Sequence, residues 1–281
     1  MAKKTVRDLE VKGKRVLVRV DFNVPHKGDT ITDDTRVRAA LPTIKYLVEN
    51  GARIVLFSHL GKVDHKDPEK KESDMKKNNM APVADCLAGY VDTKVTFFPV
   101  TRGAELEEAV AAVKDGEIVL VQNTRYEKGE SKNDPELAAY WAGLGDLFVS
   151  DAFGSVHRAH ASTVGIAEHL PSAVGFLVEK ELKFLGDAVV NPARQFVGIL
   201  GGAKVADKLK VIDNLLEKCD TLIIGGGMAY TFLKAQGYET GTSLVDMEKV
   251  EYCAEMLKKA ETLGKKLLLP VDTVVAGAFP D

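Results

Sequence analysis

The sequence predicts an α/β protein with two parallel-sheet domains, the second of them incomplete. Short apolar runs, such as Arg15–Val20, alternate along the chain with segments of helical periodicity. Strands that alternate with helices form parallel sheets, and the helices cover both faces of those sheets. The alternation breaks at 171–175 and starts again at Phe196. This predicts a first domain over 1–175, a connecting helix and hinge over 176–194, and a partial second domain over 195–281.

Net charge and cysteine usage limit the class of protein. The chain has 281 residues and a formal net charge of -3, whereas nucleic-acid-binding proteins are usually basic. The sequence shows neither the apolar start of a signal peptide nor the roughly 20 apolar residues of a membrane span. Cys86, Cys219 and Cys253 are widely spaced, which is typical of free, buried thiols in a reducing compartment. We therefore expect a cytoplasmic protein that binds neither nucleic acid nor membrane.

The elements of the first domain follow from local patterns. Its strands are the apolar runs at 15–20, 53–57, 95–98, 118–121 and 147–149. Helical patterns occupy 81–87, 105–113 and 135–141, and a further helix ends at Asn50, before Gly51.

Two segments of this domain are less regular. Pro42 suits the first turn of a helix, so we expect Arg36 and Arg38 to lie in a separate turn before it. Residues 63–79 contain lysines and acidic residues with almost no apolar side chain, which predicts a mobile surface loop.

Polar and basic residues follow several of these strands directly. They are Asp21, Asn23, His59, Lys62, Arg125 and Arg158. Arg36, before the first helix, can face the same way. Ligands of open α/β sheets bind beyond the carboxyl ends of the strands. Clustered cations repel one another unless an anion neutralises them, and each charge-assisted contact contributes about 1.5–3 kcal/mol. The pattern favours a small, multiply anionic substrate over arginines scattered on the surface.

A helix over 178–190, with Leu182 and Leu185 inward, is expected to connect the two domains. The second sheet begins with a buried strand at 196–200, and Gly201 and Gly202 end that strand. A second strand at 221–224 runs into three further glycines, and residues 246–263 form an amphipathic helix.

The first glycine turn of this domain is followed by lysines. Helical spacing begins at Val205, so Lys204 and Lys208 would lie on one face of the opening helical turns. Amides at a helix start lack intrahelical partners and bind anions. The strand, the glycine turn and the helix start with its two lysines therefore predict a polyphosphate site. The alternative is that the lysines only form a solvated helix face.

Five motifs occur in a characteristic order along the chain. They are Arg-Val-Asp-Phe-Asn-Val-Pro at 19–25, Ser-His-Leu-Gly at 58–61, Ser-Asp-Ala-Phe at 150–153, Leu-Gly-Gly-Ala-Lys-Val-Ala-Asp-Lys at 200–208 and Ile-Gly-Gly-Gly-Met-Ala at 224–229. By this set the chain resembles the phosphoglycerate kinase family along its whole length. The resemblance implies a monomer with two Rossmann-like domains facing each other across a cleft. It also implies reversible phosphoryl transfer between 1,3-bisphosphoglycerate and ADP, giving 3-phosphoglycerate and ATP in glycolysis.

The resemblance also implies roles for individual residues. Asp21 and Asn23 match the positions that bind the glycerate hydroxyl and carboxylate end. The basic residues that match the 3-phosphoglycerate site are Arg36, His59, Lys62, Arg125 and Arg158. Arg36 and Lys204 match the catalytic positions, where they stabilise the transferring group. The nucleotide site would comprise Gly202, Ala203, Lys208, Gly226 and Gly227.

Two features depart from the family pattern. Many members carry arginine where this chain has Lys62, so a bidentate contact becomes a point charge. The family also continues past Asp281, into a glutamate for the ribose and a Gly-Gly-Gly-Asp loop for the phosphates and Mg²⁺. We therefore expect no metal ligand within this chain. The alternative function is a truncated, non-catalytic fragment that binds 3-phosphoglycerate without turnover.

Other classes of protein fit the sequence less well. A Rossmann dehydrogenase needs G-x-G-x-x-G after a strand, and a P-loop kinase needs G-x-x-x-x-G-K-[ST]; the sequence has neither. His157 and His160 lie three residues apart, but no further His or Cys near them completes a metal site. His59 can act as a general base or as a hydrogen-bond donor, and the sequence favours the donor.

Overall fold

The computed structural model describes residues 3–190, 192–274 and 276–277. The chain divides into two compact units, Met1–Phe184 and Leu185–Asp281. Parallel sheets in both units confirm the predicted α/β class. The expected limits at 175 and 194 remain predictions, and Asn191, between them, lies outside the described residues, as does the expected end of the second domain at 278–281.

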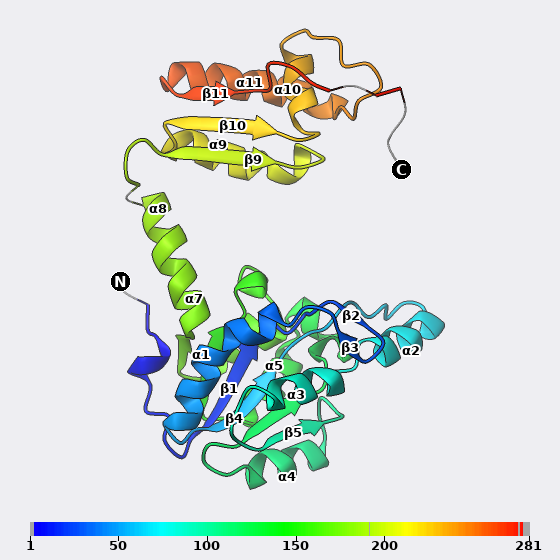
Figure 1. Ribbon diagram of the computed structural model, residues 1–281, viewed down its shortest axis with the longest axis vertical. Helices are drawn as coiled ribbons and strands as arrows, with labels where there is room; N and C mark the ends of the chain where they lie inside the picture. The colour runs from blue at the N-terminus through cyan, green and yellow to red at the C-terminus, as the bar shows by residue number, and fades with distance from the viewer. Residues whose placement is uncertain (1–2, 191, 275, 278–281) are drawn as a thin grey trace. The chain divides into compact units, whose positions relative to one another are not determined.

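The described residues of the first unit contain a six-stranded parallel sheet in the order β5-β6-β4-β1-β7-β8 (Figure 1). In that order the strands are Val95–Phe98, Ile118–Val121, Arg53–Phe57, Arg15–Val20, Leu147–Asp151 and Ser172–Val174. β1 lies at the centre, where Val18 pairs with Leu56 of β4 on one side and Val149 of β7 on the other. A small hairpin, β2 (His26–Lys27) and β3 (Thr30–Ile31), follows β1.

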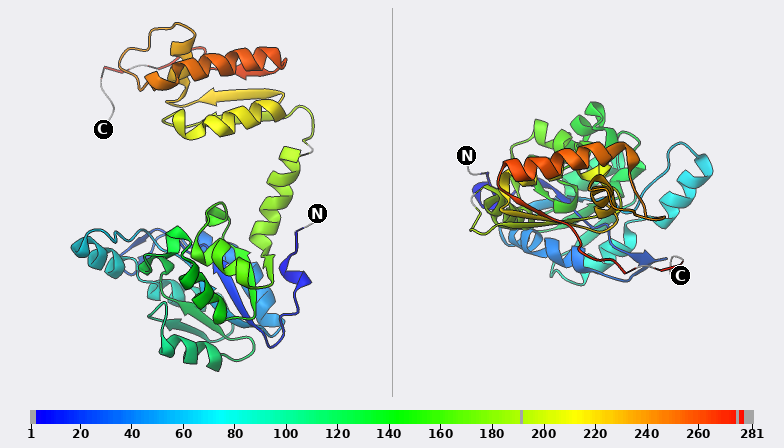
Figure 2. Two further views of the ribbon diagram at one scale, coloured as in Figure 1. Left: turned by 180° about the vertical axis from the view of Figure 1, so that it is seen from behind. Right: turned by 90° about the horizontal axis from the view of Figure 1, so that it is seen from above.

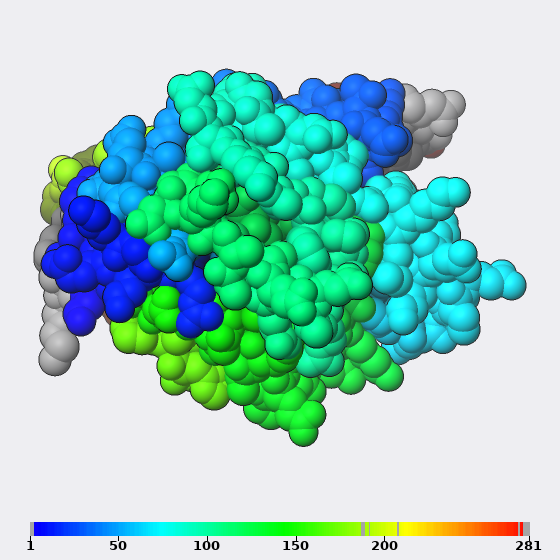
Figure 3. Space-filling model, turned by 90° about the horizontal axis from the view of Figure 1, so that it is seen from below, coloured from blue at the N-terminus to red at the C-terminus, as the bar shows by residue number. Residues whose placement is uncertain are grey.

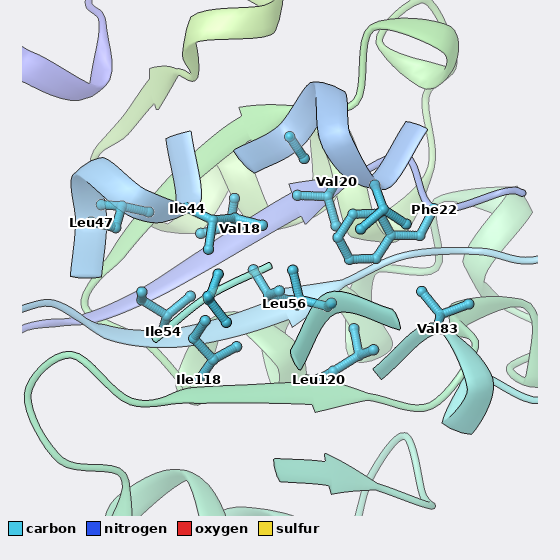
Figure 4. Packing of buried hydrophobic residues seen from close by; sticks show 14 of the residues in the cluster. Val18, Val20, Phe22, Ile44, Leu47, Ile54, Leu56, Val83, Ile118 and Leu120 are labelled. Atoms are coloured by element: carbon cyan, nitrogen blue, oxygen red, sulfur yellow. The ribbon is translucent and has the colours of Figure 1, made fainter. Parts of the chain in front are cut away.

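Helices cover both faces of this sheet, which is why its strands are nearly continuous apolar runs. On one face, Val18 and Val20 of β1 pack with Ile44 of α1 (Thr35–Glu49) in a cluster that includes α3 (Ala81–Ala88) (Figure 4). On the other face, Leu17 belongs to a cluster that includes the fully buried Trp141. The helices of that face are α4 (Ala104–Ala112), α5 (Pro135–Gly143) and α6 (Ile166–His169) (Figure 2).

Short helical turns occupy several of the connections. The 3-10 turns are η1 (Val6–Asp8), η2 (Thr124–Tyr126), η3 (Glu130–Lys132), η4 (Phe153–Ser155), η7 (Ala206–Lys208) and η8 (Met247–Lys249). Two π-helical turns are η5 (Ala161–Gly165) and η6 (Leu182–Gly186). No helix of the described residues is both long and apolar enough to span a bilayer.

The structure corrects the expectation for the first helix. Pro42 lies inside α1, so Arg36 and Arg38 belong to the first turn of one continuous helix. An internal proline removes a backbone hydrogen bond and costs about 3 kcal/mol. Burial of Val37 before the proline and Ile44 after it offsets that cost by keeping the helix on the sheet.

The expected loop at 63–79 is also wrong in part, because it contains helix α2 (Pro68–Lys77). The Asp67 side chain caps the helix by accepting from the amides of Glu69 and Lys70 at 3.1 and 3.2 Å. Pro68 occupies the first position, where its missing N–H has no cost. None of the described side chains of α2 is buried, and Figure 3 shows this cyan segment projecting from the surface. Capping, rather than an apolar face, defines the helix.

Two further segments differ from expectation around the connector. Residues 172–174 form the edge strand β8, which pairs Ala173 with Val149. The connector is helical over α7 (Phe176–Glu181), η6 and α8 (Asp187–Val190), but Leu182 and Leu185 are exposed rather than inward. Near the start of the connector, Val178 is buried.

The start of α7 is fixed by side chains of the first unit. Asp151, at the end of β7, accepts from the amides of Leu177 and Val178 at 3.0 and 3.2 Å. Thr43 of α1 accepts from the amide of Phe176 at 2.8 Å. Burial raises the pKa of Asp151 to about 6.

The second unit has a three-stranded parallel sheet among its described residues, in the order β11-β10-β9. The strands are Lys266–Leu268, Thr221–Gly225 and Val197–Gly201, and the helices are α9 (Leu209–Lys218), α10 (Ala229–Ala235) and α11 (Val250–Thr262). Ile224 packs with Ile212 of α9 and Phe232 of α10 in its core. The predicted buried strand is instead an edge strand, β9, whose Val197 and Ile199 are exposed.

The three cysteines are free, as expected, but they are not all buried. Cys86 is half-buried, whereas Cys219 and Cys253 are buried.

Candidate functional site

The polar residues that follow the strands converge because their strands are neighbours. β6, β4, β1 and β7 are adjacent in the sheet and parallel, so their carboxyl ends lie along one edge. The loops after them carry Arg125, His59, Asp21 and Arg158, in that order across the sheet. The structure therefore brings residues up to 137 positions apart, Asp21 and Arg158, to one edge.

Asp21 and Arg36 form an ion pair at this edge. Arg36 Nη1 donates to Asp21 Oδ2 at 2.7 Å. The Asp21 side chain is 10% exposed and that of Arg36 is 48% exposed, so the guanidinium keeps donors that face solvent. Gly154 lies against this pair, because a Cβ at that position would be 2.5 Å from Asp21 Oδ2. The α1 start thus presents one arginine, anchored by a carboxylate, to any anion that binds here.

Hydrogen bonds link the loops after three strands. Asn23 Oδ1 accepts from the amide of Gly61 at 2.8 Å, and Arg125 Nη1 donates to the Gly61 carbonyl at 2.6 Å. Asn123 is fully buried, and its Oδ1 accepts from the amides of Leu60 and Arg125 at 3.2 and 3.0 Å. The loops after β1, β4 and β6 consequently hold one another in place.

His59 is buried beside Arg19. Arg19 Nη2 lies 2.9 Å from His59 Nδ1. Because every guanidinium nitrogen is a donor, Nδ1 must accept, and the neutral ring carries its proton on Nε2. Burial, together with the charges of neighbouring arginines, lowers the pKa of His59 from its ordinary 6.5 to about 2. Those arginines are Arg19, Arg125, Arg36 and Arg158. A ring with Nδ1 engaged and Nε2 protonated can donate a hydrogen bond from Nε2 and has no free lone pair to accept a proton, which favours the donor over the general base.

His59 is expected not to titrate in the folded protein between about pH 5.5 and 8.5, because its pKa lies far below that range. The ring ¹⁵N signals of labelled histidine measure this directly, and the same chain unfolded in urea should titrate near 6.5. Below that pH the unfolded state binds more protons than the folded one, so His59 contributes to a loss of stability as the pH falls. A midpoint above about 5.5 for His59 would contradict the assigned environment.

The remaining residues predicted for this site differ in position. Arg158 is exposed, and its Nε lies 3.4 Å from His157 Nε2. It is close enough to Arg125 and His59 to lower the pKa of each. Lys62 is also exposed, and its recorded contact is made by its carbonyl, which accepts from Asn78 at 2.9 Å. Arg158 thus joins Asp21, Arg36, His59 and Arg125 at this edge of the sheet.

Two charged residues that sequence reasoning missed lie beneath the site. Arg19 and Glu130 are fully buried. The signal for Arg19 was present in the sequence, since it interrupts an apolar strand that is buried on both faces. Glu130 gave no such signal, because it lies in a polar loop between β6 and α5.

Positive charge exceeds negative charge around His59. Burial lowers the pKa of Arg125, and the charge of Arg158 adds to this effect, whereas Glu130 and Asp21 oppose it. The arginines that act on one another or on His59 are Arg19, Arg36, Arg125 and Arg158, against the carboxylates Asp21 and Glu130. This excess favours a ligand with more than one negative charge.

The second unit has two glycine turns at the ends of neighbouring strands. Gly201 of β9 pairs with Gly225 of β10, and the amide of Met228 donates to the Gly202 carbonyl at 2.9 Å. Gly226 has φ +67°, and a Cβ there would lie 3.0 Å from the Gly202 backbone. A Cβ at Gly227 would lie 3.0 Å from the carbonyl oxygen of Ala203. The two turns thus pack backbone against backbone, which is an arrangement suited to a phosphate group.

The lysines of this unit do not share a helix as predicted. Lys204 precedes the 3-10 turn η7, and α9 begins only at Leu209. The reason is that the fully buried Val205 side chain anchors the loop in the core before the chain turns into the helix. Lys204 is exposed after the glycine turn, and Lys208 is half-buried at the end of η7.

The described residues do not include three His, Cys, Asp or Glu side chains grouped closely enough to hold a metal ion. His157 is exposed beside Arg158, whereas His160 is buried with Nδ1 3.4 Å from Glu130 Oε2. The two histidines therefore have different environments and partners.

The comparisons with known proteins agree on one family. A family model described as phosphoglycerate kinase matches residues 6–280. The phosphoglycerate kinase of Enterococcus faecalis is 57% identical over 284 residues, which are 99% of this chain and 69% of that protein. That of Lactococcus lactis subsp. cremoris is 59% identical over 285 residues, again 99% of this chain and 69% of that protein.

Solved structures show the same relationship. The phosphoglycerate kinase from Coxiella burnetii matches with a TM-score of 0.82 and 38% identity, over 96% of this chain and 66% of that one. The enzyme from Pyrococcus horikoshii matches with a TM-score of 0.80 and 30% identity, over 95% of this chain and 67% of that one. The chain therefore spans about two thirds of the length of the relatives it matches. On sequence and structure alike, it belongs to the phosphoglycerate kinase family.

Proposed function

We propose that the chain catalyses reversible phosphoryl transfer between 1,3-bisphosphoglycerate and ADP, which gives 3-phosphoglycerate and ATP. The observation that carries this proposal is the convergence of arginines and neutral His59 at the carboxyl ends of four adjacent strands. Family membership supports the phosphoglycerate as ligand and favours a kinase over a non-catalytic fragment. We expect a cytoplasmic monomer that acts without nucleic acid or membrane.

The first unit is proposed to bind 3-phosphoglycerate. Its phosphate and carboxylate would face the arginines, and a desolvated charge-assisted contact contributes about 1.5–3 kcal/mol. Arg36 and Arg125 are already oriented by Asp21 and Gly61, so little conformational entropy is lost when they bind the anion. Asn23 and Asp21 would bind the glycerate hydroxyl and carboxylate end.

The second unit is proposed to bind ADP or ATP. Gly202, Ala203, Gly226 and Gly227 form the paired turns, where the missing Cβ atoms let backbone approach a phosphate closely. Lys208 would contact the nucleotide phosphates. Mg²⁺ would enter with the nucleotide, whose phosphate charge it neutralises.

Phosphoryl transfer depends on positioning and charge neutralisation rather than on covalent catalysis. An acyl phosphate already carries a good leaving group, so the site needs neither a nucleophile nor a general base. This agrees with a protonated Nε2 on His59. Arg36 and Lys204 would neutralise charge on the transferring group, and both are exposed enough to reach a ligand.

Replacing Arg158 with alanine is expected to weaken 3-phosphoglycerate binding by about 1.5 kcal/mol, roughly tenfold. The effect is at the low end for a charge-assisted contact because Arg158 is exposed. Titration calorimetry measures it, with Arg53→Ala as control, because Arg53 is half-exposed at the amino end of β4. Equal affinities for the two variants would contradict the placement of Arg158 in the site.

ATP formation from 1,3-bisphosphoglycerate and ADP, followed in a coupled assay, tests the activity itself. Turnover by the chain supports the kinase. Binding of 3-phosphoglycerate without any ATP formation would instead favour the non-catalytic alternative.

A further inference from the structure

A line of buried polar groups lies behind His59, and the mechanism above does not use it. Glu130 in η3, Ser162 in η5 and Arg19 in β1 are all fully buried. Ser162 Oγ donates to Glu130 Oε1 at 2.6 Å, and Arg19 Nε donates to Ser162 Oγ at 2.8 Å. Arg19 Nη2 donates to His59 Nδ1 at 2.9 Å. Four side chains from four separate elements or loops therefore form one continuous chain of hydrogen bonds.

The direction of each bond in this chain is determined by chemistry. Arginine has five N–H donors and no acceptor, so Arg19 must donate to both His59 and Ser162. The Ser162 hydroxyl has one proton, and with its lone pair engaged by Arg19 it donates that proton to the Glu130 carboxylate. Arg19 Nη1 also donates to the Val20 carbonyl, which further restrains the guanidinium. His59 accordingly has one tautomer available, with the proton on Nε2.

Glu130 supplies the charge that a buried arginine requires. Burial lowers the pKa of Arg19, and the carboxylates of Glu130 and Asp21 oppose that effect. A buried charge without a partner is strongly destabilising. Asp21 is engaged by Arg36, whereas Glu130 Oε1 is linked to Arg19 through Ser162. Glu130 is thus the carboxylate connected to Arg19 by hydrogen bonds among the described residues.

The second carboxylate oxygen of Glu130, Oε2, lies beside His160. Glu130 Oε2 lies 3.4 Å from His160 Nδ1, too far or too poorly aligned to count among the hydrogen bonds of the described residues. Burial lowers the pKa of His160, and the charge of Glu130 opposes that effect.

We propose that Glu130 and Ser162 are positioning residues that act through Arg19 to hold His59 as a neutral hydrogen-bond donor to the anionic ligand. This inference rests on the proposed function, because the donor is assigned to 3-phosphoglycerate. The described residues show no protein hydrogen bond to His59 Nε2, which leaves this N–H free for a ligand. Glu130 also balances the Arg19 charge, so that the cationic edge stays assembled before an anion arrives.

Ser162→Ala tests the relay with a small change that preserves the charges. Removal of the hydroxyl disconnects Arg19 from Glu130 and frees the guanidinium to move away from His59 Nδ1, so His59 should show both tautomers in its ring ¹⁵N spectrum. Affinity for 3-phosphoglycerate should fall about fivefold, as for one lost neutral hydrogen bond. Ser172→Ala is the control, since Ser172 lies in the edge strand β8 and donates to the Leu170 carbonyl. Its His59 spectrum should match that of the unchanged protein.

Glu130→Gln separates the charge from the hydrogen bond, because glutamine can still accept from Ser162. We expect a lower melting temperature and weaker 3-phosphoglycerate binding than in Glu127→Gln. Glu127 is a matched control in the same loop, half-buried and bonded to Thr101 instead. Failure of Glu130→Gln alone to fold would also support its role as counter-ion to Arg19.

The tautomer is measured without ligand, so the two proposals can fail separately. An unchanged chain that binds no 3-phosphoglycerate would contradict the proposed function and leave the tautomer result intact. A folded Ser162→Ala variant with an unchanged His59 spectrum and unchanged affinity would overturn the positioning role alone.

Discussion

Replacing Lys204 with alanine is expected to lower kcat by roughly 10²–10³-fold with little change in the affinity for nucleotide. Lys204 is exposed immediately after the first glycine turn, and the turn packs its backbone against the second one. A cation at this position can neutralise charge that develops on the transferring phosphoryl group. Lys208, at the end of η7, is expected to contribute to nucleotide binding instead.

Steady-state kinetics and nucleotide titration of the same variants distinguish these roles. Lys210→Ala is the matched control, because Lys210 is an exposed lysine on the neighbouring α9. It should retain kcat and KM. A Lys204→Ala variant with normal kcat and a much raised KM for ATP would show that the two lysines exchange roles.

Gly154→Ala is expected to lower kcat/KM by about 10²-fold, as for a displacement of about 1 Å in the site. Gly154 lies in η4, between β7 and Arg158. A Cβ at Gly154 would come within 2.5 Å of Asp21 Oδ2, closer than packed atoms approach, so the carboxylate or the turn must move. Asp21 holds Arg36 at 2.7 Å, and movement of either residue misplaces that arginine.

Gly143→Ala provides the control for this substitution. Gly143 ends α5, and outside its adjacent residues and the backbone of its own helix no atom of the described residues lies within 4 Å of the position that its Cβ would take. Its kinetics should be unchanged, and its free energy of unfolding should be equal or higher by about 0.4–1 kcal/mol, because alanine restricts the unfolded chain. Wild-type kinetics in Gly154→Ala would show that the Asp21–Arg36 pair is not required for the reaction.

Lys204 could be identified from the sequence alone, whereas Gly154 could be identified only from the structure. Lys204 stands out in the sequence, because it follows a strand and two glycines. Gly154 does not, since its contact with Asp21 joins segments 133 residues apart. The pattern after each strand was enough to select Asp21, His59, Arg125 and Arg158, because parallel strands place their carboxyl ends together. Arg36 was selected from its place before the first helix instead.

Helix boundaries were predicted less well where capping or tertiary packing, rather than the local apolar pattern, determines the helix. The helix α2 has no buried side chain among its described residues, and its stability depends on the Asp67 cap and Pro68. In α1, tertiary burial of Val37 and Ile44 overrides the local preference of Pro42. The prediction that Lys204 and Lys208 share one helix was wrong for a similar reason: burial of Val205 in the core means that α9 begins only at Leu209.

The sequence by itself determined the α/β class, the positions of β1, β4, β5, β6 and β7, and the basic residues that follow several of them, because apolar periodicity is a local property of the chain. Only the tertiary structure decided the state of His59. Its tautomer depends on Arg19, and Arg19 depends on Ser162, 143 residues away in the sequence, and on Glu130, 32 residues before that serine. Such a network forms only when the sheet and the loops around it pack together, since each buried charge is tolerated because another element supplies its partner.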